Sequence, residues 1–159
     1  KDLLISLVDT AYAYGYDDFE RDILQKSLDS LYVMNYEVKD YVAVIDRIPS
    51  YFKHSMELLD PKVRESLFYK HSTILTKVKD SVPARYGVDS SVKNSIIFRS
   101  VKVGKGAVVR NSIVMEDGII MENATLDYTI TDKDVIIKDG RHLSGHESYP
   151  MVVVKGKVI

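Results

Sequence analysis

The sequence contains no cysteine, which excludes disulfide bonds and metal sites built on thiolates and suits a reducing compartment such as the cytoplasm. It also has no excess of either charge, because its formal net charge is −1 over 159 residues. A global basic field that would hold nucleic acid or an anionic membrane is therefore absent. Long apolar runs are missing as well, since Leu3–Val8 and Met151–Val154 are far shorter than a membrane span. We predict a cytoplasmic protein without nucleic-acid or membrane partners.

The residues that are present suit one ordinary folded domain or two small ones. Hydrophobic residues make up 45% of the chain and charged residues 28%, a composition that disfavours disorder. The sequence starts at Lys1 without methionine and enters a helix-like pattern at once, which indicates a chain taken from a longer one.

Residues 1–68 carry mixed helix and strand signals. The segment Asp17–Glu20 resembles a capping box, and aliphatic residues at helical spacing follow it. Two β-prone runs, Val33-Met34 and Tyr41–Ile45, predict short strands. Pro49 suits the first turn of a helix, which Asp60-Pro61 should end before a further helix starts. This part therefore reads as a fragment of an α/β domain.

Residues 69–88 form a predicted linker. Ile74, Thr76 and Val78 alternate like an edge strand, and Pro83 and Gly87 then interrupt the pattern.

Residues 89–159 repeat. Three segments of the pattern aliphatic–polar–polar–small–aliphatic lie 17 residues apart: Val92–Ile96, Val109–Ile113 and Leu126–Ile130. Within this 17-residue spacing, an aliphatic residue recurs every six residues, except for one interval of five. Four residues after each of them lies a residue that we expect at a corner of the coil. These pairs are Val103/Ala107, Val109/Ile113, Val114/Gly118, Ile120/Ala124 and Leu126/Ile130. We predict a left-handed parallel β-helix of about three coils, in which the aliphatic residues fill a triangular interior.

The glycine-rich segment Gly104-Lys105-Gly106 is the only G-x-G of the chain. The six-residue period places it at a solenoid corner, which favours a turn over a phosphate-binding loop.

The chain resembles the glucose-1-phosphate adenylyltransferase (ADP-glucose pyrophosphorylase) family over nearly its whole length. Tyr51–Asp60 is similar to the family stretch Tyr-aromatic-x-x-Asn-Met-Asp-Leu-Leu, and Asn94–Gly104 resembles the start of its β-helix. The ending Tyr149–Ile159 resembles that of the bacterial non-catalytic paralogue. The resemblance implies that residues 1–68 are the C-terminal part of a Rossmann-like nucleotidyltransferase domain.

The family makes ADP-glucose and pyrophosphate from ATP and glucose 1-phosphate with Mg²⁺, for bacterial glycogen synthesis. The resemblance implies a regulatory or assembly subunit that joins a catalytic homologue in a hetero- or homo-tetramer. No cofactor is expected in this chain, and Mg²⁺ belongs to the catalytic homologue. The effector, the stoichiometry and the state of the upstream catalytic motifs stay open.

Catalytic members carry Trp-x-Asp-Val-Gly-Thr shortly before the aromatic helix, and the aspartate helps to hold the metal and the sugar phosphate. Alignment on Met56 without gaps places Val44 at this aspartate and Asp46 at the glycine. A slip of two residues brings Asp46 to the aspartate but replaces Val-Gly-Thr with Arg47-Ile48-Pro49. Either alignment degrades the site, so we expect no catalytic residue here and leave the enzyme class of the whole subunit open.

Other candidate residues have ordinary alternatives. Arg99 lies near the position where resembling enzymes bind a sugar-phosphate effector; Arg85 and Arg110 are weaker candidates, and a solvated face explains all three. Arg47 could bind a phosphate or pair with its neighbour Asp46. His142 and His146 have a zinc-like spacing, but no third ligand stands out and nearby glycines indicate a loop.

Three other functions remain open: an active pyrophosphorylase for another sugar phosphate, a hexapeptide-repeat acyltransferase, and a purely structural scaffold. The acyltransferase would need a histidine projecting from a coil, and residues 92–141 contain none. Resembling proteins have about one further coil before Asn94, so this solenoid is either short or truncated.

Overall fold

The computed structural model describes residues 1–69, 75 and 79–159. They group into two compact units, Lys1–Lys39 and Asp40–Ile159, and each unit is described by itself. The predicted edge strand at Ile74, Thr76 and Val78 lies outside the described residues. Among the described residues, no helix has both the length and the apolar character that a membrane span requires.

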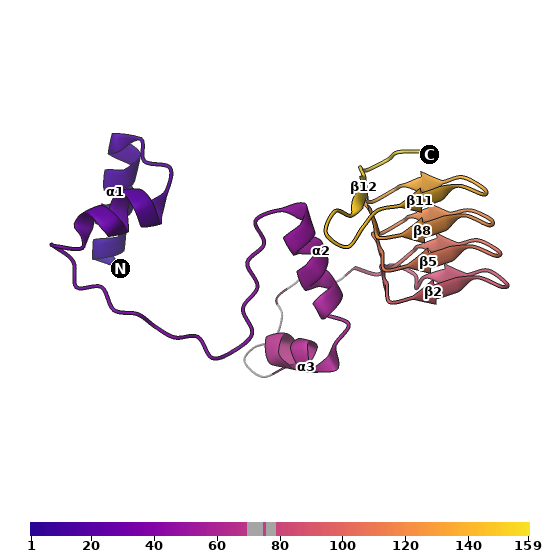
Figure 1. Cartoon of the computed structure of the whole chain (residues 1–159), viewed down its shortest axis with the longest axis horizontal. Helices are drawn as coiled ribbons and strands as arrows, with labels where there is room; N and C mark the ends of the chain where they lie inside the picture. Colours follow the sequence, from indigo (N-terminus) through magenta and orange to yellow (C-terminus); the bar gives the residue numbers. More distant parts are fainter. Residues whose placement is uncertain (70–74, 76–78) are drawn as a thin grey trace. The chain divides into compact units, whose positions relative to one another are not determined.

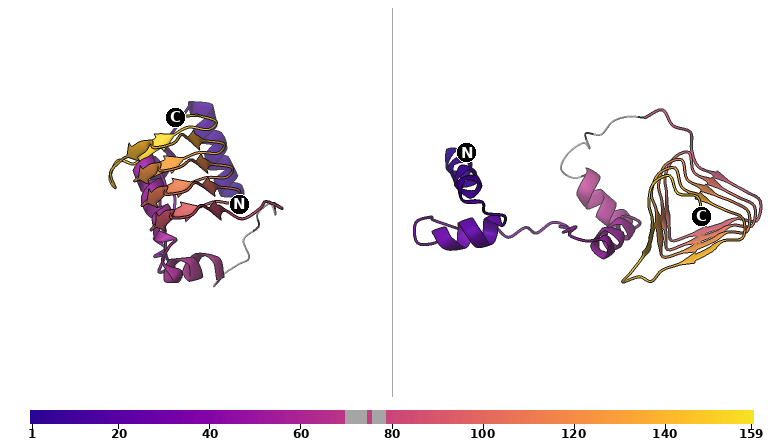
Figure 2. Two further views of the ribbon diagram at one scale, coloured as in Figure 1. Left: turned by 90° about the vertical axis from the view of Figure 1, so that its right-hand side faces the viewer. Right: turned by 90° about the horizontal axis from the view of Figure 1, so that it is seen from above.

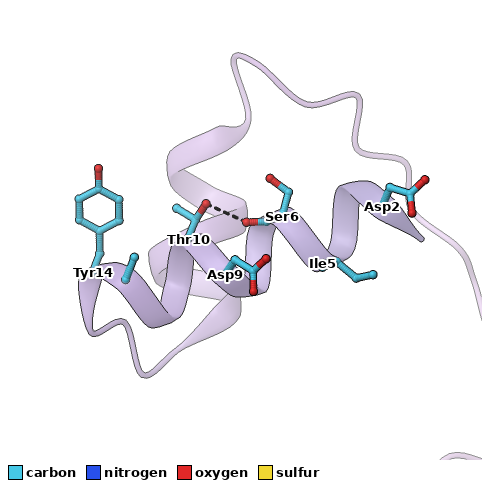
Figure 3. Close-up of a pocket in the computed structure, with 7 residues that line it drawn as sticks. Asp2, Ile5, Ser6, Asp9, Thr10 and Tyr14 are labelled. Atoms are coloured by element: carbon cyan, nitrogen blue, oxygen red, sulfur yellow. Dashed lines mark hydrogen bonds between the residues drawn. The ribbon is translucent and has the colours of Figure 1, made fainter.

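The first unit consists of short helices. Helix α1 (Asp2–Tyr14) ends at Gly15, whose positive φ of 64° closes the helix in the left-handed conformation. Figure 3 shows a shallow pocket along one face of α1, where Thr10 donates a hydrogen bond to the backbone carbonyl of Ser6. The next helical stretch comprises η1 (Glu20–Leu24) and η2 (Gln25–Ser27). The capping box predicted at Asp17–Glu20 is shifted by one residue, because the carboxylate that accepts from the backbone is that of Asp18, bonded to the N–H of Arg21.

The two β-prone runs Val33-Met34 and Tyr41–Ile45 do not form strands. Both are extended without regular structure, and Val44 is 70% exposed. A strand needs a neighbour for its backbone hydrogen bonds, and no described residue of the chain pairs with either run. The strand prediction for these runs is wrong, while the assignment of residues 1–68 to an α/β nucleotidyltransferase domain stays a prediction.

The second unit begins with an extended segment, and three helices follow among its described residues before the β-strands. Helix α2 (Ile48–Glu57) follows Arg47 and carries proline in its first turn, as predicted. Helix α3 (Pro61–Arg64) starts after Asp60, whose carboxylate accepts a hydrogen bond from the N–H of Lys62. The π-helix η3 (Glu65–Tyr69) continues from it.

The remainder is a left-handed parallel β-helix (Figure 1). Its twelve strands are β1 (Arg85–Tyr86), β2 (Ser91–Lys93), β3 (Ile96–Ile97), β4 (Lys102–Val103), β5 (Val108–Arg110), β6 (Ile113–Val114), β7 (Ile119–Ile120), β8 (Thr125–Asp127), β9 (Thr129–Thr131), β10 (Ile136–Ile137), β11 (His142–Ser144) and β12 (Met151–Val153). They form three parallel four-stranded sheets, β1-β4-β7-β10, β2-β5-β8-β11 and β3-β6-β9-β12. These are the three walls of the triangle seen in Figure 2.

The solenoid has about four coils where the sequence indicated about three. The coil that the prediction missed begins at β1, within the predicted linker 69–88. The backbone N–H of Arg85 donates to the carbonyl of Val101 in the coil above. Arg85-Tyr86-Gly87 has no aliphatic residue to mark an interior position, which explains why the period was not visible there. The proposed boundaries of 1–68, 69–88 and 89–159 as domains stay a prediction.

The interior follows the predicted pattern with one correction. Val103, Val109, Val114, Ile120 and Leu126 are buried and pack in one cluster. Ile113 and Ile130 were expected at corners of the coils. They instead belong to a second hydrophobic cluster, outside the coils, that includes Phe52 of α2. Where the period shortens to five, the small buried residues are Ser112 and Thr129, and the isoleucine after each turns outward.

The corners of the coils are formed by residues with positive φ, most of them glycine, asparagine or aspartate. Asn94, Asn111 and Tyr128 form one column, with φ of 45°, 44° and 47°. Asn94 Nδ2 donates to Asn111 Oδ1 at 2.7 Å, and Asn111 Nδ2 donates to Asp127 Oδ1 at 3.0 Å. These bonds fasten consecutive coils together along one edge of the triangle.

Candidate functional site

Helix α2 packs on the outer face of the sheet β3-β6-β9-β12. Ile96, Ile113 and Ile130 occupy one register column of this sheet and point outward. Phe52, only 3% exposed, packs with the isoleucines of this column. Full burial of a side chain of this size contributes about 1.5–3 kcal/mol. The contact therefore fixes the helix to the β-helix.

A series of rings continues from this contact to a loop in the fourth coil. The rings of Phe52 and Tyr128 lie 6.2 Å apart, and those of Tyr128 and His146 lie 6.4 Å apart and stack. His146 Nδ1 is 3.2 Å from the backbone N of Ser148 and accepts its hydrogen bond. His146 lies between β11 and β12, so this loop (residues 145–150) lengthens the fourth coil at the corner that faces α2.

Tyr41, His54 and Glu57 form a polar cluster beside α2. The hydroxyl of Tyr41 donates to Glu57 Oε2, and His54 Nδ1 lies 2.8 Å from the same oxygen. The hydrogen bond to the Glu57 carboxylate, together with burial and the negative charge, raises the pKa of Tyr41 to about 12. The hydrogen bond from Tyr41, with a further one from His54, holds the pKa of Glu57 below its usual range.

The cluster gives a pH-dependent prediction. The pKa of Tyr41 is raised in the folded state, so its contribution to stability is present below about pH 10 and is lost as the pH rises through about 12. Glu57→Gln removes the negative charge, and the pKa of Tyr41 should fall toward about 10, measured by the absorbance of tyrosinate. Glu147→Gln, a carboxylate with no bond to Tyr41, is the control. An unchanged Tyr41 titration in Glu57→Gln would refute the assignment.

Two grooves flank α2 where it faces the β-helix. One, of about 360 Å³, is lined by Phe52, Lys53, Met56, Glu57, Asn94, Asn111, Tyr128 and Glu147. The other, of about 550 Å³, is lined by Arg47, Pro49, Ser50, Lys53, His54, His146, Glu147 and Ser148. Lys53 and Glu147 border both grooves, so the two adjoin. We call them together the α2 groove.

Of the residues aligned with the family aspartate motif, Arg47 lines this groove. Val44 is exposed in the extended segment, and its alignment to the family aspartate stays a prediction. Asp46 Oδ1 accepts a hydrogen bond from Ser50 Oγ at 2.8 Å and lies 3.4 Å from Arg47 Nε. The hydrogen bond from Ser50 is the main cause that lowers the pKa of Asp46. The ordinary reading of Arg47 as a surface ion pair with Asp46 is confirmed.

The three candidate arginines differ in their contacts. Arg99 Nη1 donates to the backbone carbonyl of Ser81 at 2.9 Å and so ties the chain ahead of β1 to the first coil. Arg110 pairs with Asp127 of the next coil at 3.0 Å, and Arg85 is exposed on β1. The effector role of Arg99 stays a prediction.

The remaining sequence candidates lie at a corner, on a strand and in a loop of the β-helix. Gly104-Lys105-Gly106 lies at a corner, as predicted, with Gly106 at a φ of 65°. His142 is exposed on β11, and His146 stacks on Tyr128. Within the described part of the chain, no group of three or more histidine, aspartate or glutamate side chains is placed to hold a metal ion.

The sequence did not reveal the cluster or the groove. His54 and Glu57 are three residues apart on a helix, a spacing that puts them on one face. Tyr41 lies 13 residues from His54 outside the helix, and no spacing rule connects it to α2. Asn94, Asn111 and Tyr128 join the groove only because the coils stack at 17-residue intervals.

Comparison with known proteins agrees with this architecture. The family model described as GlmU-like, C-terminal hexapeptide, matches residues 76–148. The glycogen biosynthesis protein GlgD of Bacillus subtilis (strain 168) is 36% identical over 169 residues, which cover 96% of this chain and 49% of that protein. The chain is a GlgD homologue.

Other relatives extend the comparison. GlgD of Geobacillus stearothermophilus is 47% identical over 35% of this chain and 20% of that protein. A glucose-1-phosphate adenylyltransferase of Fervidobacterium nodosum is more distant, at 27% identity over 77% of this chain and 33% of that protein. The chain spans at most about half the length of these curated relatives.

Proposed function

We propose that the protein is a regulatory and assembly subunit of glucose-1-phosphate adenylyltransferase, acting in glycogen biosynthesis in the cytoplasm. The observation that carries this proposal is the similarity to GlgD, which extends over 96% of the chain. The more distant similarity to glucose-1-phosphate adenylyltransferases supports a partner of that kind.

The chemistry near α2 supports a non-catalytic role. Under the ungapped alignment, the position of the metal aspartate is Val44, whose aliphatic side chain cannot coordinate Mg²⁺. Under the shifted alignment, Asp46 already accepts from Ser50 and pairs with Arg47 at the start of α2. Neither alignment fits a Mg²⁺ site, so the proposal assigns the metal to the catalytic partner.

The proposed partner is a catalytic subunit, and the proposed assembly is a tetramer in which the β-helix contacts neighbouring subunits. The α2 contact gives this assembly a physical route to the α/β region. Phe52 joins α2 to the sheet β3-β6-β9-β12, and the segment that carries Val44 directly precedes this helix. Arg99 is proposed to bind a sugar-phosphate effector near the first coil.

The experiment is pyrophosphate release from ATP and glucose 1-phosphate by a catalytic glucose-1-phosphate adenylyltransferase, with and without the protein. The proposal expects the protein to change the rate or the effector response of the catalytic subunit, and the two to elute together in size exclusion. A catalytic subunit whose rate and elution volume are unaffected at equimolar protein would contradict the proposal. Arg99→Gln should weaken the effector response while leaving co-elution intact.

A further inference from the structure

The α2 groove has charges that cancel. Its lining includes two full cations, Arg47 and Lys53, and two carboxylates, Glu57 and Glu147. Two of these four are already engaged, since Arg47 pairs with Asp46 and Glu57 accepts from Tyr41. A polyanion would therefore meet as much repulsion as attraction here. The lining favours a neutral ligand.

The uncharged polar groups of the groove are held in place, and some of their hydrogen-bonding atoms have no partner among the described residues. Asn94 donates through Nδ2 to Asn111, and no described residue donates to its Oδ1. Among the described residues, the hydroxyl of Tyr128 likewise has no hydrogen-bond partner. Both residues stand at solenoid corners with positive φ, and the inter-coil hydrogen bonds fix the corner. Groups fixed in advance lose little entropy when a ligand binds.

The floor of the groove is apolar and aromatic. Phe52, Met56 and Tyr128 line it between α2 and the corner column, and His146 continues the row of rings into the adjoining half. An aromatic floor with amide, hydroxyl and ammonium groups at its rim matches a pyranose. The CH face of that ring is apolar and its edge carries hydroxyl groups that both donate and accept. The volumes of the two halves lie within the range of small-ligand sites.

We propose that the α2 groove binds a neutral oligosaccharide, an α-linked glucan. The groove chemistry selects an oligosaccharide, and the choice of an α-glucan rests on the proposed function in glycogen biosynthesis. Asn94 Oδ1 accepts from one sugar hydroxyl, Lys53 donates to a second, and the hydroxyl of Tyr128 bonds to a third. A glucan bound here would contact both α2 and the loop at His146. Glucan binding would therefore act on the helix that follows the segment carrying Val44.

Electrophoresis of the protein through native gels that contain glycogen tests the site, with isothermal titration of maltoheptaose for affinity. The protein is expected to migrate more slowly as the glycogen concentration rises. Asn94→Gly removes the amide while tolerating the positive φ, and should weaken maltoheptaose binding about fivefold. Asn123→Gly is the matched control, because Asn123 has a φ of 56° at another corner and does not line the groove. Lys53→Ala is a second test that leaves the coil corners untouched.

The outcomes separate the glucan site from the proposed function. The site is supported if glycogen slows the wild-type protein in the gel, if Asn94→Gly and Lys53→Ala both weaken this effect, and if Asn123→Gly leaves it unchanged. The site is overturned if glycogen does not slow the protein and maltoheptaose gives no heat of binding. It is also overturned if Asn123→Gly loses as much binding as Asn94→Gly. Binding of cellohexaose in place of maltoheptaose would keep an oligosaccharide site and overturn the α-glucan assignment. Pyrophosphate release in the mixture with the catalytic subunit is measured on the same samples, so either proposal can fail while the other holds.

Discussion

Phe52→Ala is expected to lower the free energy of unfolding by about 3–5 kcal/mol, because it empties the contact between α2 and the β-helix. Phe52 is 3% exposed and packs on Ile113 and Ile130, which no other described residue of α2 covers as deeply. The cavity would lie against a rigid sheet that cannot collapse into it. Urea unfolding followed by circular dichroism measures the loss.

Phe98→Ala is the matched control for this prediction. Phe98 directly follows β3 of the same sheet and is 40% exposed, so its removal should cost much less. Hydrogen exchange of α2 amides gives a second readout, since the helix should open more readily in Phe52→Ala and not in Phe98→Ala. Equal losses in the two variants would contradict the view that Phe52 fixes the helix.

Gly145→Ala is expected to cost about 3 kcal/mol or more, since the new methyl group would collide with backbone on both sides. A Cβ at this position would lie 2.4 Å from the carbonyl oxygen of Tyr128 and 2.5 Å from the backbone N of Met151. These two atoms are joined by the hydrogen bond that starts β12, so neither can move without breaking the coil. Thermal unfolding of the variant measures the loss.

The control for Gly145 is Gly140→Asn in the same coil. A Cβ at Gly140 meets no atom within 4 Å, and its φ of 65° suits asparagine. Asn123 occupies the equivalent corner one coil earlier with a φ of 56°. Gly140→Asn should therefore change stability by less than about 1 kcal/mol. If Gly145→Ala were as stable as the control, the backbone around Tyr128 and Met151 would have room for the methyl group, which would contradict the close contact described here.

The sequence predicts the β-helix well because its signal is local. A valine or isoleucine every six residues, with small residues at the corners, is enough to place Val103, Val109 and Ile120 inside. The prediction fails where the period slips to five, because the sequence does not say which residue of Ser112-Ile113 turns inward. A small, hydrogen-bonded serine fits the crowded corner, and Ile113 gains a partner in Phe52. That partner lies 61 residues away, beyond the reach of any periodic pattern.

The same reason limits the candidate site. The helix boundaries around Pro49 and Asp60 follow from local rules of capping and proline placement. The groove depends on where α2 comes to rest on the solenoid, and only the folded chain brings Lys53 beside Asn94 and Glu147. The strands expected at Val33-Met34 and Tyr41–Ile45 fail for a related reason, since β-propensity alone supplies no pairing partner.

The most direct test of the account is ADP-glucose formation by the protein alone, with ATP, glucose 1-phosphate and Mg²⁺. The account predicts no turnover above background, because it places Val44, or Asp46 bonded to Ser50 and Arg47, at the position of the family aspartate that holds the metal. Turnover comparable to that of a glucose-1-phosphate adenylyltransferase would contradict it and would identify the protein as a catalyst with a rearranged site.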